Sequence, residues 1–257
     1  MTENSSESGG TGLPASIEAA WGLRDRPVKG PKPGLTLDRI VAAAVAVAAS
    51  EGLPAVSMGR VAKELGVSTM SLYRYVSAKE ELYVLMREAA MGVPAPLPAL
   101  EDGAGWREAL RQWAWAQRRM FRRSLWSLRI PISGPPASPH SVAWWEQGLQ
   151  ALEGSGLHEG DKISVILLVE GFVRNEALLM SDLAAAVEAK GVPAQEVMAQ
   201  WERTVKRLVD PTRHPALSAL LASDVMSGPD DGDHDFAFGL ERILDGVEVL
   251  IGKGAPS

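Results

Sequence analysis

The chain contains no cysteine, which excludes disulfides and thiolate metal sites and gives no sign of an oxidising compartment. No apolar run reaches the length of a membrane-spanning helix, and the N-terminus lacks the apolar core of a signal peptide. We therefore expect a cytoplasmic protein without a membrane partner. The sequence also lacks a phosphate loop, a nucleophile elbow and a zincin motif, and its four histidines are scattered. We expect no catalytic residues, no metal and no cofactor.

Alternating apolar and polar residues, the pattern of a half-buried strand, are also missing. Apolar residues recur instead at helical spacing along most of the chain. The sequence therefore predicts an all-α fold. The expected helices span residues 37–50, 57–65, 68–76, 77–90, 106–125, 140–153, 161–190, 192–209 and 236–251.

The segment 57–76, SMGRVAKELGVSTMSLYRYV, predicts two short helices joined by a tight turn. Ser57 and Ser68 are suited to cap the two helices, and Gly66 can adopt the left-handed conformation that ends the first. The apolar residues of the pair can share one buried face, which leaves polar and aromatic residues on the open face of the second helix. This arrangement is a helix-turn-helix that fits a DNA major groove. The alternative is an ordinary helical hairpin.

The surrounding sequence favours the DNA-binding interpretation. The alanine-rich stretch 37–50, with Thr36 as its N-cap, predicts a first helix, and Ser77 with Glu80 has the spacing of a capping box for a fourth. Together these motifs resemble the TetR family of bacterial transcriptional regulators. The matching sequences are VA at 61–62, LGVS at 65–68, LYRYV at 72–76 and KEEL at 79–82. The resemblance implies a two-fold homodimer with a helical C-terminal domain that binds an inducer.

The second helix of the pair supplies most of the predicted DNA contacts. Hydroxyl groups of Thr69 and Ser71 can reach base edges, Met70 can touch a thymine methyl, and Arg74 can reach a guanine or a phosphate. Phosphate contacts are expected for Tyr73, Tyr75 and Lys79, and the resemblance implies backbone contacts for the first and last of these. Ser57, Arg60 and Ser68 complete the predicted DNA-binding set. Some relatives carry a long basic residue where this chain has Gly59, so we expect no base reading from the first helix of the pair.

Charge is distributed unevenly along the chain. Residues 24–79 hold nine Lys or Arg against four Asp or Glu, whereas residues 80–257 hold 17 against 25, within a net charge of −6. A basic N-terminal part suits a protein that presents one end to phosphates. The expected organisation is a disordered tail and basic arm at 1–34, a DNA-binding domain with its connecting helix at 35–91, and a ligand-binding and dimerisation domain at 92–257. The arm at 24–34 is either a groove contact or a solvated linker.

Aromatic and aliphatic residues of the larger domain suggest a pocket and an interface. Wide rings can line an apolar pocket, although they also fill cores, and the candidate lining residues are Trp113, Trp126, Trp144 and Phe172. A stripe on the last helix, paired with the long helix 161–190 across a two-fold axis, is the candidate dimer interface. It consists of Leu240, Ile243, Val247 and Leu250.

Two charged runs in the larger domain have ordinary interpretations. The acidic run 230–235 does not have the register of a calcium loop, so we expect its acids to favour the start of the following helix. The arginine-rich run 118–123 could hold an anionic ligand or DNA. A solvated helix face that pairs with nearby acids is the commoner use of such a run.

These features predict a sequence-specific DNA-binding transcriptional regulator, and specifically a repressor released by an unknown small-molecule inducer. Its partners would be a palindromic double-stranded DNA operator, the inducer and a second copy of the chain. One alternative is an activator or a ligand-independent regulator on the same fold. A less favoured alternative is an all-α enzyme with an incidental helix-turn-helix.

Overall fold

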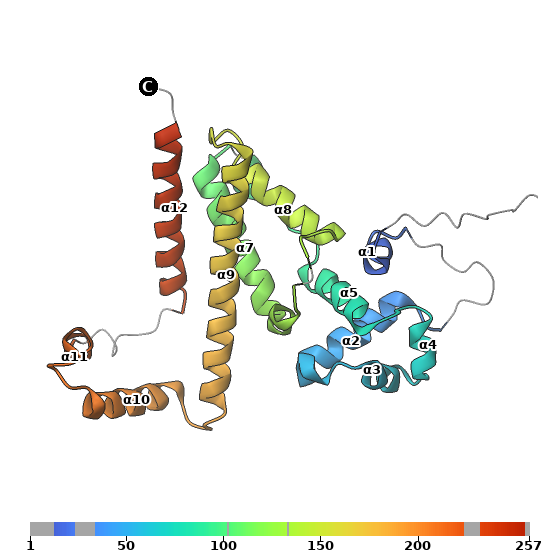
Figure 1. Ribbon diagram of the computed structural model, residues 1–257, viewed down its shortest axis with the longest axis horizontal. Coiled ribbons are helices and arrows are strands. Elements are labelled where there is room, and N and C mark those ends of the chain that lie inside the picture. Colours follow the sequence, from blue (N-terminus) through green and yellow to red (C-terminus); the bar gives the residue numbers. More distant parts are fainter. Residues whose placement is uncertain (1–12, 24–33, 102, 133, 224–231, 255–257) are drawn as a thin grey trace, which may run out of the picture.

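A computed structural model describes residues 13–23, 34–101, 103–132, 134–223 and 232–254. Every regular element within these ranges is a helix, so the predicted all-α fold is confirmed. Helices α1 to α5 form an N-terminal unit, the head, and helices α6 to α12 form a larger unit, the body (Figure 1). None of the described helices combines the length and apolar content needed to cross a membrane.

The head contains six short elements. They are α1 (Ala15–Ala20), α2 (Leu37–Glu51), the 3-10 helix η1 (Leu53–Ala55), α3 (Met58–Leu65), α4 (Thr69–Tyr73) and α5 (Lys79–Met91). Their apolar faces meet in one core, where Ile40, Val61, Leu72, Val76 and Leu82 are all fully buried. Helices α3 and α4 form the predicted helix-turn-helix.

Local capping explains where these helices begin and end. The Ser57 hydroxyl accepts a hydrogen bond from the Arg60 N–H at 3.1 Å, and the Ser68 hydroxyl accepts one from the Ser71 N–H at 3.3 Å. Gly66 ends α3 with φ of 67°, as predicted. The expected capping box at Ser77 is wrong: α5 begins at Lys79, and the Glu81 carboxylate instead accepts from the Ser77 N–H at 2.7 Å.

Helix α1 contradicts the expected disorder of the first residues. It packs against α5, and Ala19 and Ala20 lie against the head core. The Trp21 indole N–H donates to the Ala137 carbonyl at 2.8 Å, which ties the end of α1 to the segment that leads into the body. Sequence reasoning missed this short helix, because its alanines lie in a segment whose overall composition is polar. The predicted basic arm lies at residues 24–34, and all but its last residue is outside the described residues.

The body is built around three long helices. Its elements are α6 (Pro98–Glu101), α7 (Trp106–Arg123), the 3-10 helix η2 (Leu125–Arg129), α8 (Pro139–Ala151), α9 (Glu159–Glu188), α10 (Ala194–Leu208), α11 (Pro215–Ala222) and α12 (His234–Gly254). Helix α7 packs against α8, α9 and α12, so it lies at the centre of the body. Figure 1 shows α9 and α12 side by side, with α10 and α11 beyond the end of α9.

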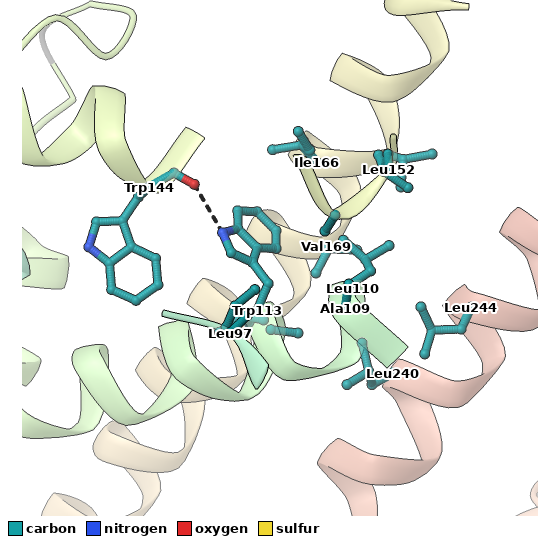
Figure 2. Packing of buried hydrophobic residues seen from close by; sticks show 14 of the residues in the cluster. Leu97, Ala109, Leu110, Trp113, Trp144, Leu152, Ile166, Val169, Leu240 and Leu244 are labelled. Atoms are coloured by element: carbon teal, nitrogen blue, oxygen red, sulfur yellow. Dashed lines mark hydrogen bonds between the residues drawn. The ribbon is translucent and has the colours of Figure 1, made fainter. Parts of the chain in front are cut away.

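Trp113 occupies the middle of the body core, among Leu110, Leu152 and Ile166 (Figure 2). It is fully buried, and its indole N–H donates to the Trp144 carbonyl at 3.0 Å. The ring lies directly over α8 at Gly148, where an added Cβ would come within 2.7 Å of it. Only glycine at position 148 leaves room for this ring.

Most of the predicted interface stripe on the last helix faces the protomer's own core. Leu240 and Val247 are 1% and 3% exposed because they pack inward against the core of their own protomer, and Ile243 is partly buried beside them. Only Leu250 of the four is exposed. Apolar residues do project from both helices, on the outward side. On α9 these are Leu167, Leu168, Leu179 and Leu183, and on α12 they are Phe238 and Val249.

Arginines of α7 tie the body helices together through acids. Arg118 is 2% exposed, and its guanidinium pairs with Glu176 of α9 at 2.8 Å and with Asp233 at 2.5 Å. Arg107 pairs with Glu241 and Asp245 of α12. The arginine run thus pairs with nearby acids as expected, but Arg118 is buried and does not lie on a solvated face. The described residues hold no group of side chains that could bind a metal ion.

Candidate nucleic-acid interface

Helix α4 presents the surface expected to meet DNA. Its anchor is Leu72, which is fully buried in the head core. On the opposite side Met70 is 74% exposed and Tyr73 is 45% exposed, and Arg74 follows them at the end of the helix. Arg74 is exposed, and its side chain forms no hydrogen bond or ion pair with another described residue. An apolar anchor therefore fixes the helix while its polar and aromatic face remains open.

Hydroxyl groups begin this surface. The Ser68 and Ser71 hydroxyl oxygens lie 2.9 Å apart, so each is oriented by the other. Thr69 and Ser71 are half-buried, and Ser68 is exposed. Lys79, at the start of α5, lies with its ammonium 5.0 Å from the centre of the Tyr83 ring. The structure thus brings the predicted residues of α4 and the start of α5 to one end of the head.

Two predicted DNA contacts have partners inside the head instead. Arg60 pairs with Glu51 at 2.6 Å and with Glu64 at 2.8 Å, and its hydrogen bond lowers the pKa of the Glu51 carboxyl. The Tyr75 hydroxyl donates to the Leu35 carbonyl at 3.0 Å and so holds the start of α2 against the end of α4. Both groups thus have protein partners in this structure, and their contacts with DNA stay predictions. Ser57 is exposed, but its hydroxyl caps α3.

The four aromatic residues predicted to line a ligand pocket occupy packed positions. Trp113 and Trp144 are buried, and the Trp144 indole N–H donates to the Gly92 carbonyl at 3.1 Å. Phe172 stacks on Phe236 with ring centres 5.3 Å apart. Trp126 packs against the head core rather than inside the body. None of the four lines the body cleft of about 350 Å³ that lies beside α6 and α7. We therefore correct their assignment to core packing.

A polar cluster that sequence reasoning missed joins the head to the body. Arg87 of α5 donates to the carbonyls of Ile130 and Pro131, at 3.1 and 2.7 Å, and Arg174 of α9 donates to the Leu128 carbonyl at 2.5 Å. Two guanidinium groups thus hold the segment that contains η2. Burial lowers the pKa of both arginines, and the positive charge of Arg174 lowers the pKa of Arg87 further.

Glu170 lies one helical turn before Arg174, and its carboxyl group has a raised pKa. Burial raises the pKa of the Glu170 carboxyl, while a hydrogen bond with Trp145 of α8 and the charge of Arg174 oppose the change. The side chains of Trp145, Glu170 and Arg174 are all half-buried, so they are within reach of solvent. A Glu and an Arg four residues apart within a long apolar stretch were the available sequence signal.

Comparison with known proteins identifies the class. The family model described as "Tetracyclin repressor-like, C-terminal domain" matches residues 97–251, and the one described as "Bacterial regulatory proteins, tetR family" matches residues 40–86. The chain therefore belongs to the TetR family of bacterial regulatory proteins, and its predicted resemblance is confirmed. It is 37% identical to the HTH-type transcriptional repressor DrrR1 of Streptomyces coeruleorubidus, over 99% of this chain and 98% of that protein.

Solved structures agree with this assignment. Apo ActR from Streptomyces coelicolor is 30% identical, with a TM-score of 0.68 over 88% of this chain and 100% of that chain. ActR in complex with actinorhodin is similar with a TM-score of 0.71 over the same shares. Helix α4 is exposed on a head that matches the family's DNA-binding model, and a relative that aligns along the full chain is a repressor. The chain is therefore a DNA-binding transcriptional repressor, as predicted.

Proposed function

We propose that α4 enters the major groove of a DNA operator and reads it directly. Thr69 and Ser71 hydrogen-bond base edges, Met70 contacts a thymine methyl, and Arg74 contacts a guanine or a phosphate. Tyr73 and Lys79 contact phosphates and fix the register. The observation that carries this proposal is the open face of α4 opposite the buried Leu72. Residues 35–91 then act as the DNA-binding unit, and residues 92–257 bind ligand and partner.

We propose that two copies pair through the outward faces of α9 and α12. Leu167, Leu168 and Leu179 of α9 are each about half exposed, at 52%, 54% and 49%, and Phe238 of α12 is 58% exposed. Exposed apolar residues on two neighbouring helices favour burial against a second copy. Two heads then face a palindromic operator, one half-site each.

Sedimentation and DNA selection test this pairing together. Wild type should sediment as a dimer and should enrich a palindrome from a random duplex pool. Leu167→Glu should sediment as a monomer and bind that palindrome weakly, because one head holds one half-site. Ser164→Glu, on the same exposed side of α9 but at a polar position, is the comparison for added charge. A dimeric Leu167→Glu would refute the interface.

We propose that a small-molecule inducer acts at the cluster of Trp145, Glu170 and Arg174. A half-buried carboxyl with a raised pKa beside a partly desolvated guanidinium is typical of a binding site. The position also suits regulation, since Arg87 of α5 and Arg174 of α9 hold the same segment. A ligand that shifts α9 or η2 would move α5, which leads directly from the helix-turn-helix. DNA affinity would fall because the ligand favours another head spacing.

Release of operator DNA by actinorhodin, the molecule bound in the similar ActR structure, tests this site. We expect actinorhodin to release DNA from wild type. Glu170→Gln and Arg174→Gln should bind DNA normally but should need a much higher actinorhodin concentration for release. Glu188→Gln, which makes the same chemical change as Glu170→Gln at an exposed position near the end of the same helix, is the matched control. Equal release from all variants would place the inducer elsewhere. We also infer that the chain has no catalytic activity of its own and acts in the cytoplasm, where an operator is available.

A further inference from the structure

A cleft of about 430 Å³ lies where α1, α2, α5 and α8 meet, outside the proposed inducer site. Most of its lining is apolar, including Ala20 of α1, Val41 and Val45 of α2, and Leu85 of α5. Its polar lining residues are Asp38, Glu88 and His140. The cleft thus combines an apolar floor with two carboxyl groups, and no lysine or arginine is among its lining residues.

Glu88 is the buried carboxyl group among the residues that line this cleft. The residue is 8% exposed, and its Oε1 accepts a hydrogen bond from the His140 backbone N–H at 2.6 Å. His140 Nδ1 lies 2.9 Å from the Glu88 carbonyl oxygen, which fixes the ring on the body side of the cleft. Glu88 Oε2 is buried and has no hydrogen-bond partner among the described residues. His140 Nδ1 also lies 3.1 Å from Glu88 Oε1, on the body side of the cleft. A carboxylate in a mostly apolar cleft is costly to bury, so this position favours a partner that carries positive charge.

The remaining lining residues restrict the chemistry of that partner. Asp38, in the first turn of α2, adds a second carboxyl group to the same cleft. Two carboxyl groups repel an anion. Asp38, Glu88 and His140 do not form a metal-binding group, since no such group occurs in the described part of the chain. The size and apolar lining instead suit an organic molecule.

We propose that this cleft is a second small-molecule site, one that binds an amphiphilic organic cation. Its ammonium group pairs with the carboxyl groups of Glu88 and Asp38, and its apolar part lies between α1 and α2. Because the lining comes from the head and from His140 of α8, a bound molecule contacts the head and the body together. The proposal does not depend on the inducer site at Glu170.

Fluorescence titration of the full chain with dansylcadaverine tests the site, because this probe joins an apolar fluorophore to a primary ammonium group. We expect wild type to bind it, and Glu88→Gln to bind it about tenfold more weakly or worse, since a charged hydrogen bond is lost. The N-acetyl derivative of the probe carries no charge. It should bind wild type weakly and should not distinguish wild type from Glu88→Gln.

Two further variants separate this cleft from the rest of the molecule. Ala42→Phe places a ring in the cleft from an exposed position of α2, so it should abolish binding without disturbing the Glu88–His140 contact. Glu108→Gln makes the same chemical change as Glu88→Gln in the cleft beside α6 and α7, and should leave binding unchanged. Wild-type affinity in Ala42→Phe, or equal affinity of wild type for the probe and its acetylated form, would overturn the proposal. DNA binding and its release by actinorhodin should persist in Ala42→Phe.

Discussion

The head and the body are stabilised in different ways. In the head, short helices begin at hydroxyl caps such as Ser57 and Ser68 and meet in a small aliphatic core. In the body, long helices are joined by tryptophans and by arginine–carboxylate contacts over large sequence separations, as for Arg118 with Glu176 and Asp233. The head therefore depends on local sequence, and the body depends on pairings between distant segments.

The two regions also use arginine differently. The body arginines Arg107, Arg111 and Arg118 contact acids of other body helices or their own. Arg74 of the head has no such partner among the described residues. These three body guanidinium groups serve the fold, as Arg60 does in the head, whereas the Arg74 guanidinium is free to meet a phosphate or a base. Net charge alone would not reveal that difference.

The largest expected effect is on the body core. Trp113→Ala should lower the free energy of unfolding by about 3–5 kcal/mol, because it empties a fully buried position and frees the Trp144 carbonyl. Chemical denaturation measures the change. Trp201→Ala, at a position that is 41% exposed, is the control and should change stability little. Similar losses in both variants would mean that burial does not distinguish the two tryptophans.

Removal of the buried Arg118 should cause the second-largest loss of stability. Arg118→Ala should cost about 3 kcal/mol, because Glu176, which is 11% exposed at its side chain, is left without its cation. The double variant Arg118→Met with Glu176→Leu should recover part of that loss, since no charge then remains buried. Thermal unfolding of the three proteins is the measurement. A double variant less stable than Arg118→Ala would contradict this account.

A change at the DNA-facing surface should affect binding and spare stability. Arg74→Ala should weaken operator binding by about 1–3 kcal/mol if the side chain contacts a base. Lys79→Ala should weaken binding to all sequences alike and reduce the salt dependence, as expected of a phosphate contact. Gel-shift titrations at two salt concentrations distinguish these effects. Unchanged binding in both variants would refute the docking of α4.

Loss of a helix cap should have a smaller effect within the head. Ser68→Ala should cost about 1 kcal/mol of stability, because the Ser71 N–H loses its acceptor at the start of α4. Ser68→Asn should restore most of it, since asparagine is an equally good cap. Urea denaturation checks the order of the three proteins. An Ala variant as stable as wild type would show that the cap contributes nothing.

The smallest expected effect is a dependence on pH. Hydrogen bonds from arginines lower the pKa of Glu241 and of Asp245, so their contribution to stability is complete above their unfolded values near pH ~4. It is lost as the pH falls through the lower folded values. Solvent screens these partly exposed groups, which keeps the effect modest. Arg107→Gln should therefore lose less stability on acidification than wild type, as thermal unfolding at two pH values would show.

Sequence reasoning predicted the head better than the body because the signals for the head are local. The caps at Ser57 and Ser68, the left-handed Gly66 and the buried Leu72 were each expected from neighbouring residues, and each is confirmed. The protein partners of Tyr75 and Arg60 were not expected, because Leu35 and Glu51 lie just before α2 and at its end. The spacing of residues within the helix-turn-helix motif cannot predict contacts with residues that lie outside it.

In the body, helix positions were predictable but helix faces were not. The long helix at α9 and the last helix α12 lie close to their expected ranges. The inward face of α12 was assigned to the interface, because periodicity alone cannot distinguish an apolar stripe that contacts α7 from one that contacts a second copy. The tryptophans were ambiguous for the same reason, and the cluster at Glu170 and Arg174 depends on a contact between distant helices.

The close approach of Trp113 to Gly148 limits how these two positions can change during evolution. An indole ring at position 113 and a side chain at position 148 cannot coexist in this packing, since even a Cβ would come within 2.7 Å of the ring. A lineage that acquires alanine or a larger residue at 148 must therefore already carry a smaller residue at 113, or change both within a short interval. Relatives that keep this core should therefore vary at the two positions together. The smaller residue at 113 should come first, because it leaves only a cavity, whereas a side chain at 148 would clash with the indole ring.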